Sequence, residues 1–547
     1  MGSRFNFSFP LQVLRPRAWL LILAIFSAGL HYALMPVGNR GRNSWLPVRW
    51  AIWIDSNDWW LNFWAFVVLA GGTVAILGRT RPIWYQLLVA TSAGALVAVA
   101  IETAQFRIPG RQPDPGDLTA ALAGSFAGGC LAFFHGRRPV LGGTAVPGAE
   151  RIAFLDQTGQ LGGAELMLLD LAGAFRERSE VILFADGPFR EVLESRGVTC
   201  RVETLGGAAS GQTKDAGGVG LLRAVPEGFR LARRLTERLR NVDVVYSNTA
   251  KALLIGAVAA RWAGRPLIHH LHDIIDAAHF SALNRFLLVQ AANRGARRVI
   301  ANSEATAVAF VAAGGRKELV TVIPNGFDPE RFAVPAPEVL AKVRQELGLP
   351  DWDGHSVFGV FGRLTPWKGQ DIFLESLAQV PEAIGVIVGA ALFTKEDRAY
   401  EESLKKRAMA DDLAGRVLFA GFRPEVVPLM HSVDVIVHCS THPEPFGRVI
   451  VEAQLCGKPV IAAKAGGAEE ILEDGRTGIL VEAGDAGILA ESMRWMIAHD
   501  LERREMAAEG KEAARERFGL SAVLVATNRE IQFAANEVFK KKNQTSR

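Results

Sequence analysis

Short apolar runs alternate with amphipathic stretches from residue 151 onward. The first series predicts strands at 151–155, 180–185, 242–248, 266–272, 297–303 and 320–324. A second series predicts strands at 357–362, 384–389, 417–421, 434–440, 459–463 and 478–482. Strands that alternate with helices are typical of open α/β sheets, which bind ligands at the carboxyl ends of their strands. We therefore expect two tandem doubly wound domains that share one cleft; two unrelated binding domains are the alternative.

The chain before residue 136 follows a different pattern, with four long apolar stretches at about 18–35, 59–77, 84–101 and 119–134. Each approaches the ~17–25 residues that a helix needs to cross a bilayer. Arg15 and Arg17 precede the first stretch, as in a signal peptide. Three further stretches follow it, however, and no small-residue cleavage site is evident, so we interpret it as an anchor. An even number of spans places both termini on one side, and the arginine distribution favours the cytoplasmic side.

Composition supports this division of the chain. Of the twelve tryptophans, eight lie before residue 85, as expected for an aromatic belt at a membrane interface. Residues 1–140 carry twelve arginines and five acids, whereas the remainder carries 49 basic and 52 acidic residues, which is not the balance of a nucleic-acid-binding protein. The four cysteines lie far apart and have no metal-ligand spacing, which indicates a reducing compartment without a disulfide framework.

The loop before the fourth apolar stretch is rich in polar residues, with Glu102, Gln105, a Pro-Gly-Arg turn ending at Arg111, and then Asp114 and Asp117. These residues could form a polar site at the membrane surface, or they could be helix-end charges in solvent. Over residues 15–138 the pattern resembles the VanZ-like membrane family. The asparagine usual in that family shortly after the last aspartate is replaced by alanine here.

A Gly/Pro-rich linker separates the membrane part from the rest of the chain. The expected organisation is a transmembrane domain of about four helices at 1–138, a linker at 139–149, two α/β domains at 150–335 and 336–520, and a C-terminal helix and tail at 521–547.

Two loops that follow predicted strands carry groups suited to phosphate binding. Gly162 and Gly163 precede a helix, where glycines let backbone N–H groups approach a phosphate or sugar. Arg363 and Lys368 flank a turn, so two cations could converge on one diphosphate and neutralise a leaving group. A plain tight turn and a solvated basic loop are the respective alternatives.

The segment 444–452, EPFGRVIVE, places two acids eight residues apart at a strand–loop–helix junction. As a helix, eight residues would rise about 12 Å, comparable to the span between the sugar and the ribose of a nucleotide sugar. Glu444 could then bind sugar hydroxyls and Glu452 ribose hydroxyls. Gly466 and Gly467 form a further strand–helix turn whose amides can approach the same ligand.

Two polar residues end central strands predicted in the first domain: Asn248 ends the strand at 242–248, and His272 ends the strand at 266–272. Both could line the cleft, although a core histidine is the alternative reading of His272. The only Asp-x-Asp, at 351–353, lies in a polar loop before a strand, so no metal is expected. Lysine and arginine charges would instead stabilise the departing nucleotide diphosphate.

Residues 150–540 resemble the retaining family 4 glycosyltransferases, which have the GT-B fold. The motifs that agree in order and spacing are GGAE at 162–165, VIPNGFD at 322–328, GRL-x-x-x-KG at 362–369, EPFGRVIVE at 444–452, GKPVIA at 457–462 and GG-x-x-E at 466–470. The resemblance implies that the diphosphate binds Arg363 and Lys368, the ribose binds Glu452, and the donor sugar binds Glu444.

The resemblance also implies that Gly162 and Gly163 lie near the donor phosphates and the acceptor, and that His272 contacts the donor sugar or its phosphate. Glu470, followed by an isoleucine, matches the family's acid after the Gly-Gly turn. The expected donor-binding set is completed by Phe446, Gly447, Gly466, Gly467 and Asn248. Retention of configuration is implied by the family, with covalent and front-face routes both open.

The sequence therefore predicts a membrane-anchored glycosyltransferase with a nucleotide-diphosphate sugar as co-substrate and no separate cofactor. Its acceptor is expected to be lipid-linked or an envelope polysaccharide, and its place the bacterial inner membrane, with catalytic domains facing the cytoplasm. An Arg-rich helix at 229–240 could lie against anionic lipid or be an ordinary solvated helix. The alternatives are a catalytically silent nucleotide-sugar-binding protein, a phosphorylase or an epimerase.

Overall fold

The computed structural model describes residues 150–204, 218–348, 354–391 and 394–545, with isolated positions between 70 and 125; side chains are not described at 218–224 and 537–545. The chain divides into two compact units, Met1–Arg138 and Pro139–Arg547. The four expected membrane spans, the polar loop between them, the linker and the Asp-x-Asp segment fall almost wholly outside the described residues. Of the helices that are described, none combines the length and apolarity needed to cross a bilayer.

The first sheet of the second unit has seven strands, all parallel, in the order β3-β2-β1-β4-β5-β6-β7. The strands are β1 (Ile152–Asp156), β2 (Ser179–Leu183), β3 (Thr199–Val202), β4 (Val244–Ser247), β5 (Leu267–Leu271), β6 (Ala296–Ala301) and β7 (Val320–Val322). The apolar runs predicted all but β3, an edge strand whose side chains are exposed or half-buried and which therefore has no apolar run.

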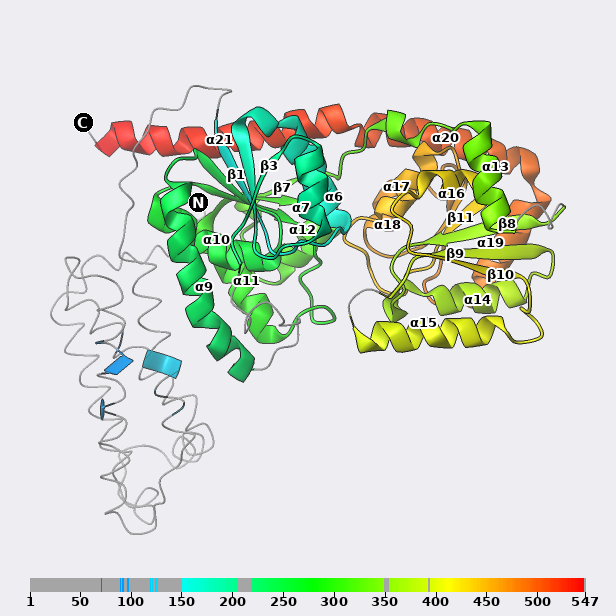
Figure 1. Cartoon of the computed structure of the whole chain (residues 1–547), viewed down its shortest axis with the longest axis horizontal. Helices are drawn as coiled ribbons and strands as arrows, with labels where there is room; N and C mark the ends of the chain where they lie inside the picture. Colours follow the sequence, from blue (N-terminus) through cyan, green and yellow to red (C-terminus); the bar gives the residue numbers. More distant parts are fainter. Residues whose placement is uncertain are drawn as a thin grey trace, which may run out of the picture. The chain divides into compact units, whose positions relative to one another are not determined.

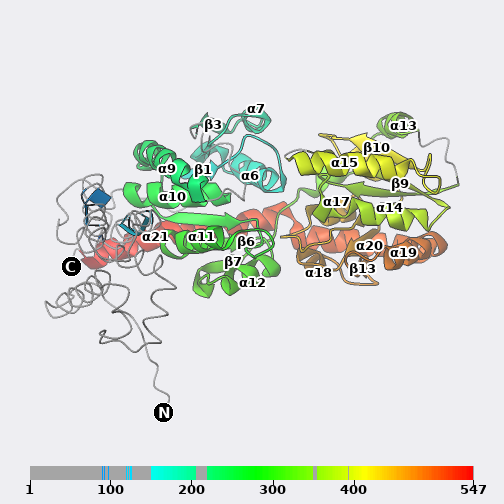
Figure 2. The same cartoon turned by 90° about the horizontal axis from the view of Figure 1, so that it is seen from below.

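Helices connect these strands and cover both faces of the sheet (Figures 1 and 2). They are α6 (Gly163–Ala174), α7 (Pro188–Ser195), α9 (Gly218–Leu239), α10 (Ala250–Ala263), α11 (Ala282–Gly295) and α12 (Glu304–Ala312), with short 3₁₀ turns at Arg176–Arg178, Lys317–Leu319 and Pro329–Phe332. The Arg-rich segment 229–240 forms the second half of α9. Its arginines are exposed, and two of them, Arg234 and Arg238, pair with Glu203.

The second sheet has six parallel strands in the order β10-β9-β8-β11-β12-β13. The strands are β8 (Ser356–Phe361), β9 (Ala383–Val388), β10 (Val417–Gly421), β11 (Val435–His438), β12 (Val460–Ala463) and β13 (Ile479–Val481). The helices are α13 (Pro337–Glu346), α14 (Gln370–Ala378), α15 (Lys395–Ala408), α16 (Val427–Ser432), α17 (Arg448–Leu455), α18 (Gly467–Ile471), α19 (Ala486–Ala498) and α20 (Asp500–Phe518), with a 3₁₀ turn at Pro366–Lys368.

Each sheet is buried on both faces, as parallel sheets covered by helices are. In β1, Ala153 and Leu155 belong to one core cluster, whereas Ile152 and Phe154 belong to the cluster on the opposite face. Two further clusters cover the faces of the second sheet. The expectation of two doubly wound α/β domains is confirmed.

We call the domain built on the seven-stranded sheet the first lobe and the domain built on the six-stranded sheet the second lobe. The last helix, α21 (Leu520–Thr545), leaves the second lobe and packs on the first lobe (Figure 1). Its apolar residues Val523, Ile531, Ala534 and Ala535 are buried in a core cluster of the first sheet. The chain therefore passes between the lobes twice, once before α13 and once between α20 and α21. At the second passage Phe327 N–H donates to Phe518 O at 2.9 Å and Leu520 N–H donates to Phe327 O at 2.8 Å.

Candidate active site

Both sheets reverse their strand order at a defined place, between β1 and β4 in the first and between β8 and β11 in the second. Open α/β sheets bind ligands outside the carboxyl ends of their strands at such switch points. The predicted site residues follow these four strands: Gly162 and Asn248 in the first lobe, Arg363 and Glu444 in the second.

In the second lobe, three donors converge on one oxygen of Glu444, a residue in the loop after β11. Lys368 forms an ion pair with Oε1, His438 Nε2 lies 2.6 Å from it, and Ser440 Oγ donates to it at 2.5 Å. The other oxygen, Oε2, has no hydrogen-bond partner among the described residues. It is the atom through which this carboxylate can accept a ligand hydroxyl.

The charge state of Glu444 follows from these neighbours. Burial alone would raise the pKa of the carboxyl group, but the charges of Lys368 and His438 and their hydrogen bonds hold it well below its ordinary value. Glu444 is therefore ionised at neutral pH. Lys368 also lies over the ring of Trp367, with 4.5 Å between Nζ and the ring centroid.

Arg363 follows β8 in the same lobe and is half-buried. Burial lowers its pKa, while the charges of Asp397 and Glu444 raise it, and a guanidinium group keeps its proton throughout the physiological range. Two cations, Arg363 and Lys368, thus lie near one ionised carboxylate. Such a pair suits a diphosphate.

Three glycines shape the loop that bears Glu444. Gly466 has a φ of +63°, and a Cβ there would lie 2.5 Å from Glu444 O, so only glycine allows this close approach. Gly467 N–H then donates to Glu444 O at 2.9 Å. Gly447 has a φ of +105° and precedes the first turn of α17. These glycines position the backbone of the predicted donor-binding loops.

Phe446, by contrast, has its ring in the core. It is 5% exposed, stacks on Phe327 with 6.3 Å between ring centroids, and meets Phe518 edge-on at 5.6 Å. Its side chain therefore packs where the chain crosses between the lobes, and any contact of this residue with the donor would be made by its backbone.

Glu452 and Arg448 lie one turn apart on α17, with Arg448 Nη2 3.3 Å from Glu452 Oε1. The guanidinium group lies over the ring of Phe327 at 4.5 Å. Its Nε and Nη1 atoms are buried and have no hydrogen-bond partner among the described residues. A Cβ on Gly163, at the start of α6 in the other lobe, would lie 3.1 Å from Arg448 Cδ. Arg448 thus links the predicted ribose carboxylate to the glycine turn of the first lobe.

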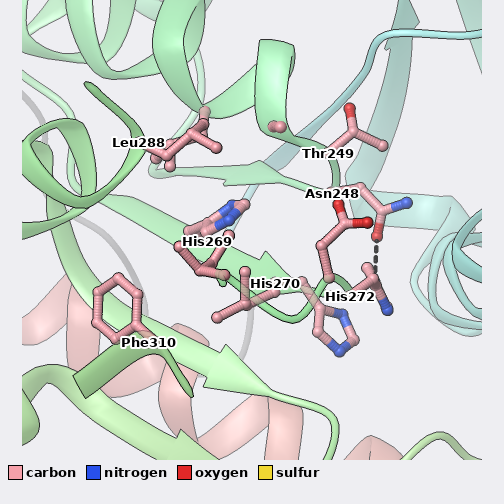
Figure 3. A pocket seen from close by; sticks show the side chains of 12 residues that line it. Asn248, Thr249, His269, His270, His272, Leu288 and Phe310 are labelled. Atoms are coloured by element: carbon pink, nitrogen blue, oxygen red, sulfur yellow. Dashed lines mark hydrogen bonds between the residues drawn. The ribbon is translucent and has the colours of Figure 1, made fainter. Parts of the chain in front are cut away.

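In the first lobe, Asn248 joins two side chains beyond the switch point (Figure 3). Its Nδ2 donates to Asp156 Oδ2 at 2.8 Å and to Ala164 O at 3.2 Å, and its Oδ1 lies 2.9 Å from His272 Nε2. Asn248 and His272 also line a pocket with His269 and His270. The structure therefore brings the two predicted polar residues into direct contact.

The three histidines on β5 and directly after it, His269, His270 and His272, are neutral at physiological pH. Burial lowers the pKa of His272 to about 3, with smaller contributions from His269 and Arg448. It likewise lowers the pKa of His269 to about 4. A neutral imidazole adds no positive charge to a diphosphate, so His272 can act only through hydrogen bonds.

Two buried carboxyl groups lie close to this pair. Burial raises the pKa of Asp156 to about 6, partly offset by its hydrogen bond from Asn248. Burial and the charge of Asp156 raise the pKa of Glu165, in the first turn of α6, to about 8. Glu165 is therefore mostly protonated at pH 7, although it stands at a helix N-terminus that favours negative charge.

Glu470 contacts a helix of the other lobe. Its two carboxylate oxygens accept hydrogen bonds from the backbone N–H groups of Glu304 and Ala305, at 2.8 and 2.7 Å, and so cap α12 of the other lobe. In the same contact Ser303 Oγ donates to Pro445 O at 2.5 Å, and Thr306 Oγ1 donates to it at 3.1 Å. The structure assigns the Glu470 carboxylate to a contact between lobes, and its role in donor binding stays a prediction.

Sequence reasoning missed five polar residues of this region. Arg448 lies inside the motif at 444–452, and His438 and Ser440 lie at the strand end just before it. Asp156 ends the first strand, and Glu165 is the acid of the GGAE motif at 162–165. The available signal was the strand end for His438, Ser440 and Asp156, and the motif that follows the strand for Arg448 and Glu165. In the described ranges no group of three or more His, Cys, Asp or Glu is arranged to hold a metal ion.

Comparison with known proteins places this geometry in a family. Residues 161–331 match the model for glycosyltransferase family 4, and residues 348–516 match the model for glycosyl transferases group 1. Among curated proteins, the GDP-mannose-dependent alpha-(1-6)-phosphatidylinositol monomannoside mannosyltransferase of Mycolicibacterium smegmatis is 30% identical over 295 residues, which cover 52% of this chain and 74% of that protein. The chain belongs to glycosyltransferase family 4.

Solved structures agree with this assignment. HepE of Anabaena in complex with UDP-glucose is 41% identical to this glycosyltransferase and superposes with a TM-score of 0.62, covering 71% of this chain and 100% of that chain. The 2-deoxystreptamine glucosyltransferase of Streptomyces kanamyceticus is 29% identical over 55% of this chain. The protein is therefore an enzyme that uses a nucleotide sugar, and its two lobes are those of the GT-B fold.

Proposed function

We propose that this glycosyltransferase transfers a hexose from a UDP-sugar to a lipid-linked or envelope polysaccharide acceptor, with retention of configuration. The observation that carries the proposal is the 41% identity to Anabaena HepE, a protein seen with UDP and with UDP-glucose, over nearly the whole of that chain. The cations Arg363 and Lys368 beside the ionised Glu444 support a diphosphate donor.

The residues divide the reaction between the two lobes. Arg363 and Lys368 would neutralise the charge that accumulates on the departing UDP. Glu444, held by three donors through Oε1, would accept a hydroxyl of the donor sugar through Oε2. Glu452, oriented by Arg448, would accept the ribose hydroxyls. Gly162 and Gly163 would bring backbone amides toward the phosphates from the opposite lobe.

The acceptor and the membrane form the second part of the proposal. Four apolar stretches precede the catalytic lobes, and the mycobacterial relative is named for a phosphatidylinositol mannoside acceptor. We propose that the N-terminal unit anchors the enzyme in the bacterial inner membrane, with the catalytic lobes on the cytoplasmic side. Anchoring would confine the active site to the surface where lipid-linked acceptors are found.

The test is a nucleotide-release assay on the full chain in membranes, with UDP-glucose, UDP-galactose, GDP-mannose and ADP-glucose, each with and without bacterial lipid extract. Release of UDP from one UDP-sugar, increased by lipid, is the expected result. Release from GDP-mannose alone would overturn the UDP assignment. A requirement for free phosphate would show that the enzyme is a phosphorylase. An epimerised sugar product would show that it is an epimerase.

Variants then test the site. Arg363→Ala and Lys368→Ala should each lower kcat by roughly 100- to 1,000-fold if they stabilise the leaving diphosphate. Lys405, an exposed lysine of α15 paired with Glu401, gives the matched control Lys405→Ala, which should retain full activity. Thermal unfolding of each variant separates loss of chemistry from loss of folding. Turnover close to that of the unmodified enzyme in both variants would refute the assignment.

A further inference from the structure

Asn248 holds an orientation that its neighbours determine. Its Nδ2 points at two acceptors, the Asp156 carboxylate at 2.8 Å and the Ala164 carbonyl at 3.2 Å. A backbone carbonyl can only accept, so the amide nitrogen, not the amide oxygen, must face this side. Reversing the amide would place an oxygen against both acceptors inside a buried site, where Asn248 and Asp156 are each 0% exposed.

The orientation of Asn248 decides the tautomer of His272. Since Oδ1 of Asn248 is an acceptor, the His272 Nε2 atom 2.9 Å away must carry the proton. In a neutral imidazole the other nitrogen, Nδ1, is then an acceptor with a free lone pair. Nδ1 of His272 has no hydrogen-bond partner among the described residues, and Figure 3 shows the contact between Asn248 and His272 among the side chains that line the pocket.

We propose that Asn248 is a positioning residue that holds His272 as the Nε2–H tautomer and so presents Nδ1 to a hydroxyl group of the transferred sugar. The Asp156 carboxylate anchors Asn248 from behind, and the three side chains form one chain of hydrogen bonds from the end of β1 to the end of β5. This inference rests on the proposed function for the identity of the sugar donor.

The arrangement decides between two ligands for His272. An acceptor nitrogen attracts a hydroxyl hydrogen and repels a phosphate oxygen, which has no proton to donate. Arg448, the nearby cation from the other lobe, contributes to keeping His272 neutral. His272 is therefore suited to bind a sugar hydroxyl, whereas Arg363 and Lys368 are suited to bind the diphosphate.

The tautomer can be observed directly by ¹⁵N NMR of histidine-labelled protein, with His272→Gln to assign the resonance. In the unmodified enzyme at pH 7, His272 should show a protonated Nε2 and an unprotonated Nδ1. Asn248→Ala should shift the resonances toward a mixture of tautomers. Ser247→Ala is the matched control, because Ser247 is equally buried and its hydroxyl contacts His269, not His272; the His272 resonances should not move.

Kinetics test the consequence. Asn248→Ala should lower kcat/KM for the sugar donor by roughly 10- to 100-fold and leave the affinity for UDP unchanged. With the four monodeoxy UDP-glucose analogues, one missing hydroxyl should cost activity in the unmodified enzyme and cost nothing further in His272→Ala. A protonated Nδ1 in the unmodified enzyme, or a penalty that persists for all four analogues in His272→Ala, would overturn the inference. The NMR result is independent of whether the donor is UDP-glucose, so its failure is distinct from failure of the proposed function.

Discussion

Two buried glutamates of the site have opposite pKa shifts. Glu165 and Glu444 are each 7% exposed, so burial disfavours the charged form of both. Lys368 and His438 reverse that effect at Glu444, whereas Asp156 adds to it at Glu165. The ionisation of a buried carboxyl group is thus decided by its charged neighbours, and this is why Glu444 can accept sugar hydroxyls while Glu165 is mostly neutral.

The pKa of Glu165 predicts how stability depends on pH. Its folded-state value of about 8 exceeds the ordinary 4.5, so the folded protein retains a proton that the unfolded chain releases between these values. This stabilisation is complete below about pH 4.5 and is lost as the pH rises through 8. Glu165→Gln should therefore raise the melting temperature relative to the unmodified protein at pH 8 and have less effect at pH 5. An equal shift at both values would show that the carboxyl group does not titrate as described.

At the scale of elements, α12 depends on the other lobe for its N-terminal cap. Ser303 caps it locally, with Oγ accepting from Thr306 N–H at 3.0 Å, and Glu470 accepts from the next two free amides across the lobe boundary. A carboxylate at a helix N-terminus also interacts favourably with the helix dipole. Because Pro445 accepts from the same helix turn, this contact also positions the loop of Glu444.

Replacing Glu470 measures that contact. Glu470→Gln removes the charge and should lower the free energy of unfolding by about 0.5–2 kcal/mol, measured by urea denaturation. Glu469, its exposed neighbour, provides the matched variant Glu469→Gln, for which no loss is expected. Equal effects of the two substitutions would show that the Glu470 cap does not contribute to stability.

The packing of the C-terminal helix α21 on the first lobe gives a second prediction. Ile531 is 0% exposed against the core of the first sheet, whereas Val525 on the same helix is 53% exposed. Ile531→Ala should cost about 2–5 kcal/mol of unfolding free energy, and Val525→Ala much less. Differential scanning calorimetry would measure both, and a small effect of Ile531→Ala would mean that α21 is not a permanent part of the first lobe.

At the scale of the whole molecule, donor binding is expected to involve both lobes. Residues suited to a nucleotide sugar come from the second lobe, and Gly163 and Arg448 approach each other across the boundary. UDP at about 100 times its dissociation constant should stabilise the folded protein by about 2.7 kcal/mol, seen as a rise in melting temperature. Lys368→Ala should abolish most of the rise at the same UDP concentration. Full stabilisation of this variant would place UDP elsewhere.

Local sequence patterns predicted both sheets and named most of the candidate site residues. Apolar runs predicted every strand except β3. Such runs are expected because a strand of a parallel sheet that is buried on both faces must be apolar throughout. The positions of Arg363, Lys368, Glu444, Asn248 and His272 followed from motifs at strand ends. An edge strand such as β3 carries no such signal, because its side chains are largely exposed.

Which of these side chains meet is set by the packing of the folded chain. The return of α21 to the first lobe, the use of Glu470 as a cap for α12, and the approach of Arg448 to Gly163 join residues more than a hundred positions apart. Local patterns report which face of an element is buried, but they contain no information on its partner. The pKa of a carboxyl group and the tautomer of a histidine depend on those partners, so they appear only when the chain is folded.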